Sequence, residues 1–178
     1  MSASTEDAIK LRKFGLMSFL VQRFESSNIE LAQQALSGIE YYANEALAWF
    51  EALSQKSKLE LVGFDAELKE IKKKVNQWRE ILEDIWGNKG KLEQVIEELD
   101  WEISRISEFS QRIKGLRGRI AEEVKEAKEA GQEAKLEELV KESGRLYNLQ
   151  RKVEDLKASI SVAKNRFEII KWEIRAKK

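Results

Sequence analysis

Apolar residues recur every three or four positions along most of this chain, which is the spacing of one face of an α-helix. The clearest series lies between residues 61 and 85, where steps of three and four alternate without a gap. A second series repeats at a spacing of seven, through Leu139, Leu146, Val153, Ile160, Phe167 and Ile174. Heptad series of this length are typical of helices that pack side by side. The pattern predicts an all-α fold.

Capping and turn residues divide the pattern into five helices. Ser27 and Ser57 are each followed three residues later by glutamate, which is the capping box that opens a helix. Residues 87–90 and Gly131 contain the glycines and asparagine that commonly end one. A turn at Ser143 and Gly144 is the alternative, but it would interrupt an intact heptad series. The predicted helices span approximately 4–25, 28–54, 57–86, 91–130 and 132–176.

The fourth predicted helix outruns the third by roughly ten residues, so its far end has only the fifth helix as a neighbour. Short turns make successive helices antiparallel. Residues 121–138 are almost all Ala, Glu, Lys and Gln, with little to bury. We therefore expect a polar two-helix tip at about 116–145. Gly115 and Gly118 each destabilise a helix interior by about 1 kcal/mol. The sequence therefore does not decide whether the fourth predicted helix is straight or kinked near them.

Two further apolar patterns predict how the other end of the molecule packs. The first helix is apolar on more than one stripe, as in helices buried on several sides. The C-terminal half of the fifth carries a second apolar line, which we expect to dock on the first two helices: Val162, Ile169, Trp172 and Ala176. The predicted architecture is one elongated domain over 1–178, an antiparallel bundle of about five helices with a protruding two-helix coiled-coil hairpin.

Composition excludes several kinds of chemistry. The chain has no Cys, His or Pro. Without Cys and His there is no disulfide, no thiolate nucleophile, no ordinary zinc site and no Ser-His-Asp triad. Carboxylate di-metal bundles normally need Glu-x-x-His pairs and are excluded too. We therefore predict no catalytic site, no cofactor and no metal.

Charge and hydropathy bear on the setting of the protein. Charged residues make up 36% of the chain, with 32 basic and 32 acidic side chains, so there is no overall basic field to attract nucleic acid. Abundant Lys and Glu without Cys resembles the composition of thermophile proteins. The apolar stretch at 14–21 is far shorter than the roughly 20 residues that span a bilayer, and no signal-peptide cleavage site follows it. We expect a cytoplasmic protein without a membrane span.

Basic residues gather locally despite the balanced total. Residues 105–119 hold five basic residues against one glutamate. Antiparallel pairing brings Lys72, Lys73, Lys74, Arg105 and Lys157 of three helices to a similar level. Together with Arg112 they form a candidate patch for anions or nucleic acid. Phosphate binding by such a patch would weaken steeply with salt. The competing interpretation, ion pairs on a solvated face, is favoured because glutamates lie nearby in sequence.

The five tryptophans are candidates for packing or for contact with a partner. Trp78 lies in the heptad series and is predicted to be core. Trp49, Trp86 and Trp172 have apolar neighbours and are predicted to pack. Trp101 lies between two acidic residues, off the apolar stripe. We expect it to be exposed and to mark a partner surface, since tryptophan is enriched at interfaces.

One segment resembles a known family. Residues 31–53 (LAQQALSGIEYYANEALAWFEAL) are similar, in the spacing of alanine and aromatic residues, to the second helix of three-helix microtubule-interacting-and-trafficking domains. The resemblance would cover about the first 86 residues and would imply a peptide-binding groove between helices. It includes no specific motif, so we assign no family.

These observations lead to a functional expectation. We expect a non-catalytic protein–protein interaction or scaffolding protein that acts through its bundle and coiled-coil hairpin, with self-association through leftover apolar surface. The alternative is a nucleic-acid-associated accessory protein that uses the local basic patch. An enzyme would need a Lys, Tyr or carboxylate site that the sequence does not display.

Overall fold

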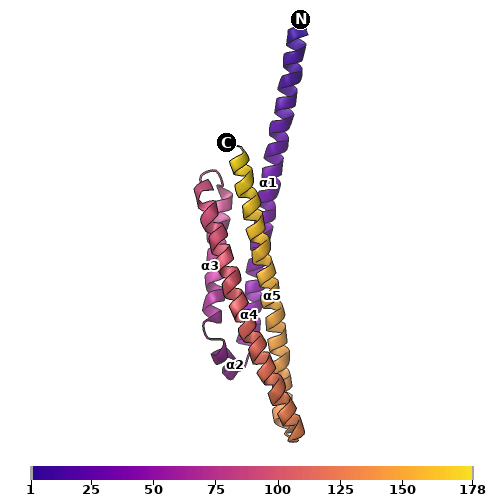
Figure 1. Cartoon of the computed structure of the whole chain (residues 1–178), viewed down its shortest axis with the longest axis vertical. Coiled ribbons are helices and arrows are strands. Elements are labelled where there is room, and N and C mark those ends of the chain that lie inside the picture. Colours follow the sequence, from indigo (N-terminus) through magenta and orange to yellow (C-terminus); the bar gives the residue numbers. More distant parts are fainter. Residues whose placement is uncertain (1, 178) are drawn as a thin grey trace.

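The fold of the chain is all-α, as predicted (Figure 1). The computed structural model describes residues 2–177, and it describes side chains from residue 27 onward. No strand occurs within residues 2–177. The elements are α1 (Ser2–Glu51), α2 (Gln55–Glu60), α3 (Phe64–Glu83), the short 3-10 helix η1 (Lys89–Lys91), α4 (Leu92–Glu129) and α5 (Glu133–Ala176).

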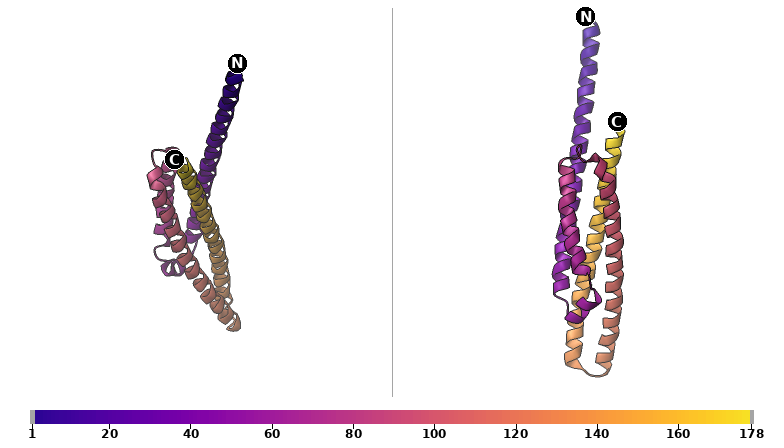
Figure 2. Two further views of the ribbon diagram at one scale, coloured as in Figure 1. Left: turned by 45° about the horizontal axis from the view of Figure 1, so that its top comes forward. Right: turned by 90° about the vertical axis from the view of Figure 1, so that its left-hand side faces the viewer.

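The hairpin of α4 and α5 forms as predicted, with its turn at Gly131. Gly131 has a φ of 68°, which a residue with a Cβ adopts only with strain. The amides of Gln132 and Gly131 donate to the carbonyls of Ala127 and Lys128 at 3.0 and 3.3 Å, the pattern of a Schellman motif. The two helices run on past the rest of the bundle and meet at this turn (Figure 2).

The first two predicted helices are one. α1 continues through Ser27, where the sequence predicts a break. Asn28 does not form the predicted turn. It is 6% exposed, and its side-chain amide donates a hydrogen bond to Glu173 of α5 at 2.5 Å. Neither proline nor glycine lies between Gly15 and Gly38, so no residue there terminates a helix. The capping box at Ser27 is overridden by packing on α5.

This continuity makes α1 longer than the bundle around it. α1 and α5 run antiparallel, and the contact between Asn28 and Glu173 lies three residues before α5 ends at Ala176. Residues 2–24 of α1, the N-terminal extension, therefore project beyond the ends of the other helices (Figures 1 and 2). Whether this segment is buried on several sides, as the sequence predicts, lies outside the described side chains. Residues 1–86 do not form a separate three-helix domain.

The third predicted helix is broken into α2 and α3. The N-cap of α2 is Ser54, whose hydroxyl accepts from the amide of Ser57 at 3.2 Å. Gly63 adopts a φ of 89° and ends this turn. Arg112 of α4 donates to the carbonyls of Glu60 and Val62, at 2.8 and 3.4 Å. These contacts satisfy carbonyls that the break leaves without helical partners.

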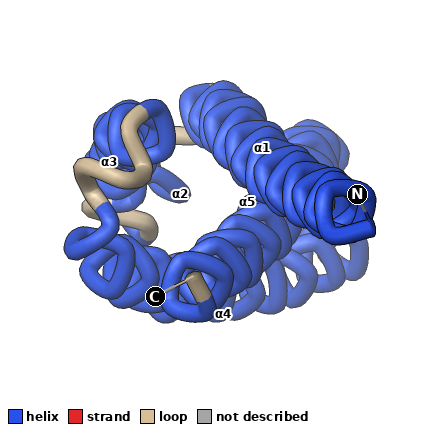
Figure 3. The backbone as a smooth tube through the Cα atoms, turned by 90° about the horizontal axis from the view of Figure 1, so that it is seen from above, coloured by secondary structure: helices blue, strands red, loops and turns tan. Residues whose placement is uncertain are grey.

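The core lies between α1, α3, α4 and α5, which surround it when viewed along the bundle (Figure 3). Phe64, near the α2 end of the core, is fully buried. Its ring centroid lies 5.8 Å from that of Phe50 and 4.8 Å from that of Phe109. This trio ties α1, α3 and α4 together. On the other side, α5 lies close to α1 where Gly38 faces Ser159: a Cβ on Gly38 would be 3.5 Å from the Ser159 hydroxyl.

The predicted docking of α5 on α1 occurs, but not through the predicted residues. Val162 is 47% exposed, Ile169 37% and Trp172 70%, and Ala176 is exposed as well. The face of α5 that enters the core instead carries Ile160, Ala163, Phe167, Ile170 and Ile174. These residues of α5 belong to the one core that it shares with α1 and α4. The second apolar line remains uncovered.

Candidate functional site

Three cations of the predicted basic patch are held by protein contacts. Lys74 lies 2.8 Å from Glu102. Arg105 lies 3.6 Å from Glu67 and 3.6 Å from Glu108. Arg112 caps the end of α2, and its guanidinium lies 5.0 Å from the centroid of the Phe109 ring. Their charge is therefore largely offset within the protein.

The other members of the patch are Lys72, Lys73 and Lys157. Lys72 and Lys157 are half-buried and Lys73 is exposed. Lys157 lies between two α4–α5 contacts, from Ser110 to Glu154 and from Asp100 to Lys164. Carboxylates are interleaved with these cations, at Glu102, Glu67, Glu108 and Glu154.

Beneath this surface lies a buried glutamate that the sequence analysis missed. Glu102 is 0% exposed, and its Oε2 has no hydrogen-bond partner among the described residues. Burial and the neighbouring carboxyl of Glu67 outweigh the effect of Lys74 and raise the pKa of Glu102 to about 7. Burial lowers the pKa of Lys74, but its hydrogen bond to Glu102 and the nearby negative charge raise it overall.

The tryptophans divide into core and surface. Trp78 is buried and its indole donates to Glu98 at 2.8 Å, and Trp49 packs against the core, as predicted. Trp101 is 60% exposed, also as predicted. The packing predicted for Trp86 and Trp172 is wrong, because they are 50% and 70% exposed. Trp86 lies beyond the end of α3, and Ile170 and Ile174 occupy the core side of α5 beside Trp172.

An exposed apolar strip runs along the C-terminal half of α5. We define it as Val162, Ile169 and Trp172, which follow one another at steps of seven and three. Val162 lines a small cavity together with Ala35 and Gly38 of α1, so the strip borders the seam between the two helices. At its upper end the strip approaches the level where the N-terminal extension leaves the bundle.

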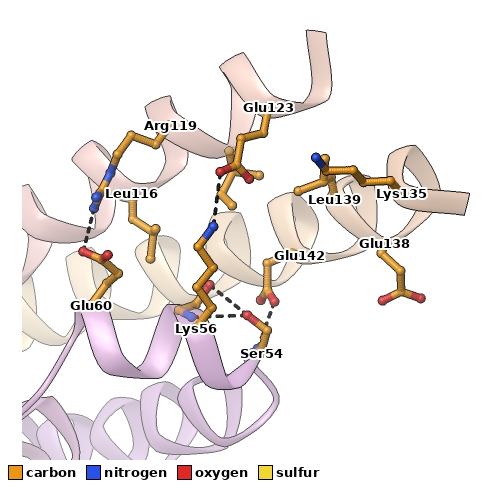
Figure 4. A pocket seen from close by; sticks show the side chains of 12 residues that line it. Ser54, Lys56, Glu60, Leu116, Arg119, Glu123, Lys135, Glu138, Leu139 and Glu142 are labelled. Atoms are coloured by element: carbon orange, nitrogen blue, oxygen red, sulfur yellow. Dashed lines mark hydrogen bonds and ion pairs between the residues drawn. The ribbon is translucent and has the colours of Figure 1, made fainter. Parts of the chain in front are cut away.

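A separate cavity of about 380 Å³ opens at the base of the hairpin, where α2 meets α4 and α5 (Figure 4). Its walls combine aliphatic and charged side chains of these three helices and of the N-cap of α2. They are Ser54, Lys56, Ser57, Glu60, Leu116, Arg119, Ile120, Glu123, Lys135, Glu138, Leu139 and Glu142. The sequence pattern did not predict a cavity at these residues.

Glu142 is the buried acid of this cavity. It is 5% exposed, and its Oε2 accepts from the backbone amide of Ser54 at 2.9 Å. Its Oε1 has no hydrogen-bond partner among the described residues. Around it, Lys56 pairs with Glu123 at 3.3 Å and Arg119 with Glu60 at 3.0 Å.

A signal in the sequence marks two of the buried glutamates, Glu102 and Glu142. Glu142 stands seven residues before Leu149, at a position of the α5 series that is otherwise apolar. Glu102 stands between Leu99 and Ile106 at steps of three and four, so it too falls in a heptad position. A charge at a core position of a heptad is costly unless it is paired. Such positions single out buried polar groups.

Two further kinds of site are not found in the described part of the chain. No group of three or more acidic residues there is arranged to hold a metal ion. None of its helices combines the length and the apolar character needed to cross a membrane.

Comparison of the chain with protein-family models, with curated proteins and with solved structures finds no match. The resemblance of residues 31–53 to a microtubule-interacting-and-trafficking domain also lacks its structural counterpart, because residues 31–51 belong to the single long helix α1.

Proposed function

We propose that this is a non-catalytic interaction or scaffolding protein that assembles through its N-terminal extension. One observation carries the proposal: α1 continues past the end of the bundle, and the part that projects has an apolar sequence (Figure 1). At about 1.5 Å per residue, residues 2–24 form a rod about 35 Å long. Most of the stability of a helix in a protein comes from tertiary packing of its apolar face. A partner would stabilise it.

The sequence of the extension supports helix pairing. Phe14, Met17, Val21 and Phe24 follow one another at steps of three, four and three, the spacing of a coiled-coil seam. The exposed strip of α5 approaches the base of the extension and enlarges the apolar surface at this end of the molecule.

The partner we propose is the extension of a second copy of this chain, in antiparallel orientation. Glu6 and Asp7 lie near one end of the extension and Arg23 near the other. Antiparallel pairing about Gly15 would set these opposite charges level with each other, whereas parallel pairing would bring like charges together. A two-fold pair also uses the same surface of both copies, as most homodimers do.

Mass measurement by light scattering across a concentration series tests this proposal. We expect a dimer for the natural chain and a monomer for the double variant Met17→Glu, Val21→Glu, which places two charges in the seam. The matched control is Ser18→Glu, Gln22→Glu, which adds the same charge off the seam and should remain dimeric. A natural chain that stays monomeric at all concentrations would contradict the proposal, and so would a control that dissociates as the seam variant does.

Nucleic-acid binding through the basic patch receives less support. Lys74, Arg105 and Arg112 already contact carboxylates or backbone carbonyls. Binding to phosphates would require these contacts to be given up, and the acidic side chains between them would oppose it.

A further inference from the structure

We propose that the cavity at the base of the hairpin binds a primary ammonium group on an aliphatic stem, with Glu142 as the acceptor. This inference is independent of the dimer proposed above, because the cavity lies at the opposite end of the molecule from the N-terminal extension (Figure 1). It rests on the carboxylate of Glu142, the charge of the cavity and its aliphatic wall.

The carboxylate of Glu142 lacks one of its hydrogen-bond donors. Oε2 is satisfied by the amide of Ser54, but Oε1 is buried and has no donor among the described residues. A buried acceptor without a partner destabilises the protein, and a buried charge without one does so more strongly. A ligand that supplies both a positive charge and an N–H to Oε1 would remove this penalty.

The charge balance of the cavity selects a cation. Lys56 and Arg119 are paired with Glu123 and Glu60 across the gap between α2 and α4 (Figure 4). After these pairs are set aside, the lining contains two carboxylates, Glu138 and Glu142, against the single ammonium of Lys135. An anionic ligand would therefore meet net negative charge.

The geometry around Glu142 favours an ammonium over other cations. A guanidinium binds a carboxylate best through both oxygens, and one oxygen of Glu142 already accepts from Ser54. Calcium and magnesium require several oxygen ligands, and the described residues offer no such cluster. A primary ammonium needs only the one free oxygen and can donate its other protons to water.

The wall of the cavity fits an aliphatic stem. Leu116, Ile120 and Leu139 line it from α4 and α5. Binding pockets commonly combine such apolar walls with a few polar groups that fix orientation. The Lys56–Glu123 pair spans the gap over these residues (Figure 4). Since Lys56 is 75% exposed, its ion pair is a weak one that a ligand can displace.

The experiment is a titration of the full chain with n-hexylamine, followed by amide chemical shifts and by the melting temperature. We expect saturable shifts at residues 54–60, 116–123 and 135–142. Glu142→Gln keeps an acceptor for Ser54 but removes the charge, and it should weaken binding by about tenfold or more. The matched control is Glu129→Gln, which removes an exposed carboxylate at the end of α4, and its affinity should be unchanged.

Two further ligands test whether the positive charge is needed and whether a lysine side chain can supply it. n-Hexanol has a similar stem without charge and should bind at least tenfold more weakly than n-hexylamine. A helical peptide with a single lysine on its leucine face tests whether a protein side chain can supply the group. Its control carries norleucine in place of lysine. Binding of the amine but not the peptide would identify a small-molecule site, and binding of both would identify a lysine-docking site.

Three results would overturn the inference: equal binding of n-hexylamine and n-hexanol, equal affinity of Glu142→Gln and Glu129→Gln, or no shifts around the cavity. A melting curve of Glu142→Gln shows whether that variant is folded. If it is unfolded, the comparison of n-hexanol with n-hexylamine on the natural chain provides the test. Failure of this inference and failure of the proposed dimer are distinguishable. The mass of the protein reports only on the dimer, because neither glutamate substitution lies in the N-terminal extension.

Discussion

Glu102 stands at a heptad position of α4 where its neighbours in the series are apolar, and it is fully buried. Its position was readable from the sequence, but its partners were not. They come from α3, and only the register between helices brings Lys74 and Glu67 against it. The same limit explains the errors at Trp86 and Trp172, whose exposure depends on where the neighbouring helices end.

The raised pKa of Glu102 predicts a pH dependence of stability. Its folded pKa of about 7 lies above the value of about 4.3 expected in the unfolded chain. The folded state therefore holds this proton more tightly. The resulting stabilisation is fully present below about pH 4.3 and is lost as pH rises through 7, with an upper bound of about 4 kcal/mol.

Denaturant unfolding of Glu102→Gln between pH 5 and 8 measures this effect. Glutamine cannot titrate, so the free energy of unfolding of the natural chain should fall relative to that of the variant as pH rises. Glu97→Gln, an exposed carboxylate on the same helix, serves as the control and should follow the natural chain. Parallel profiles for the natural chain and Glu102→Gln would refute the assignment.

At the scale of elements, the sequence predicted the helices and the hairpin turn better than it predicted the breaks. Gly131 was identified because it separates two apolar series that cannot be joined in phase. The break at Gly63 was missed, since the series through Leu61, Phe64 and Leu68 continues across it. The fusion of the first two helices was missed because a capping box is a local signal, and packing of Asn28 against α5 overrides it.

Glycine substitutions test the assignment of the turn. Gly131→Ala should destabilise the protein by about 1–2 kcal/mol, because its φ of 68° is strained for any residue with a Cβ. Gly118→Ala is the matched change inside α4, where a Cβ would meet nothing within 4 Å. It should stabilise the protein by up to about 1 kcal/mol. Urea unfolding gives both values, and equal effects would place the turn elsewhere.

At the scale of the whole molecule, burial is graded along its length. Around Phe64, the helices α1, α3 and α4 meet and the ring of Phe64 is fully buried. In the hairpin tip, Ala127 is the one buried residue among residues 121–138. The sequence predicted this contrast from composition alone, because Ala, Glu, Lys and Gln cannot form a core. The projection of the N-terminal extension was not predictable in this way, since its apolar sequence reads as buried helix.

The gradient of burial along the molecule predicts that amide hydrogens exchange by local opening in the tip and by global unfolding in the bundle. Amides of the tip should exchange through local opening, whereas those of α3 and the middle of α5 should exchange only when the whole bundle unfolds. Phe64→Ala should cost about 3–5 kcal/mol and should speed exchange in the bundle by the corresponding factor. Exchange at residues 121–138 should not change, because local opening of the tip does not break contacts of Phe64. If the tip accelerates together with the bundle, the hairpin and the bundle open as one cooperative unit, and the graded description of the molecule is wrong.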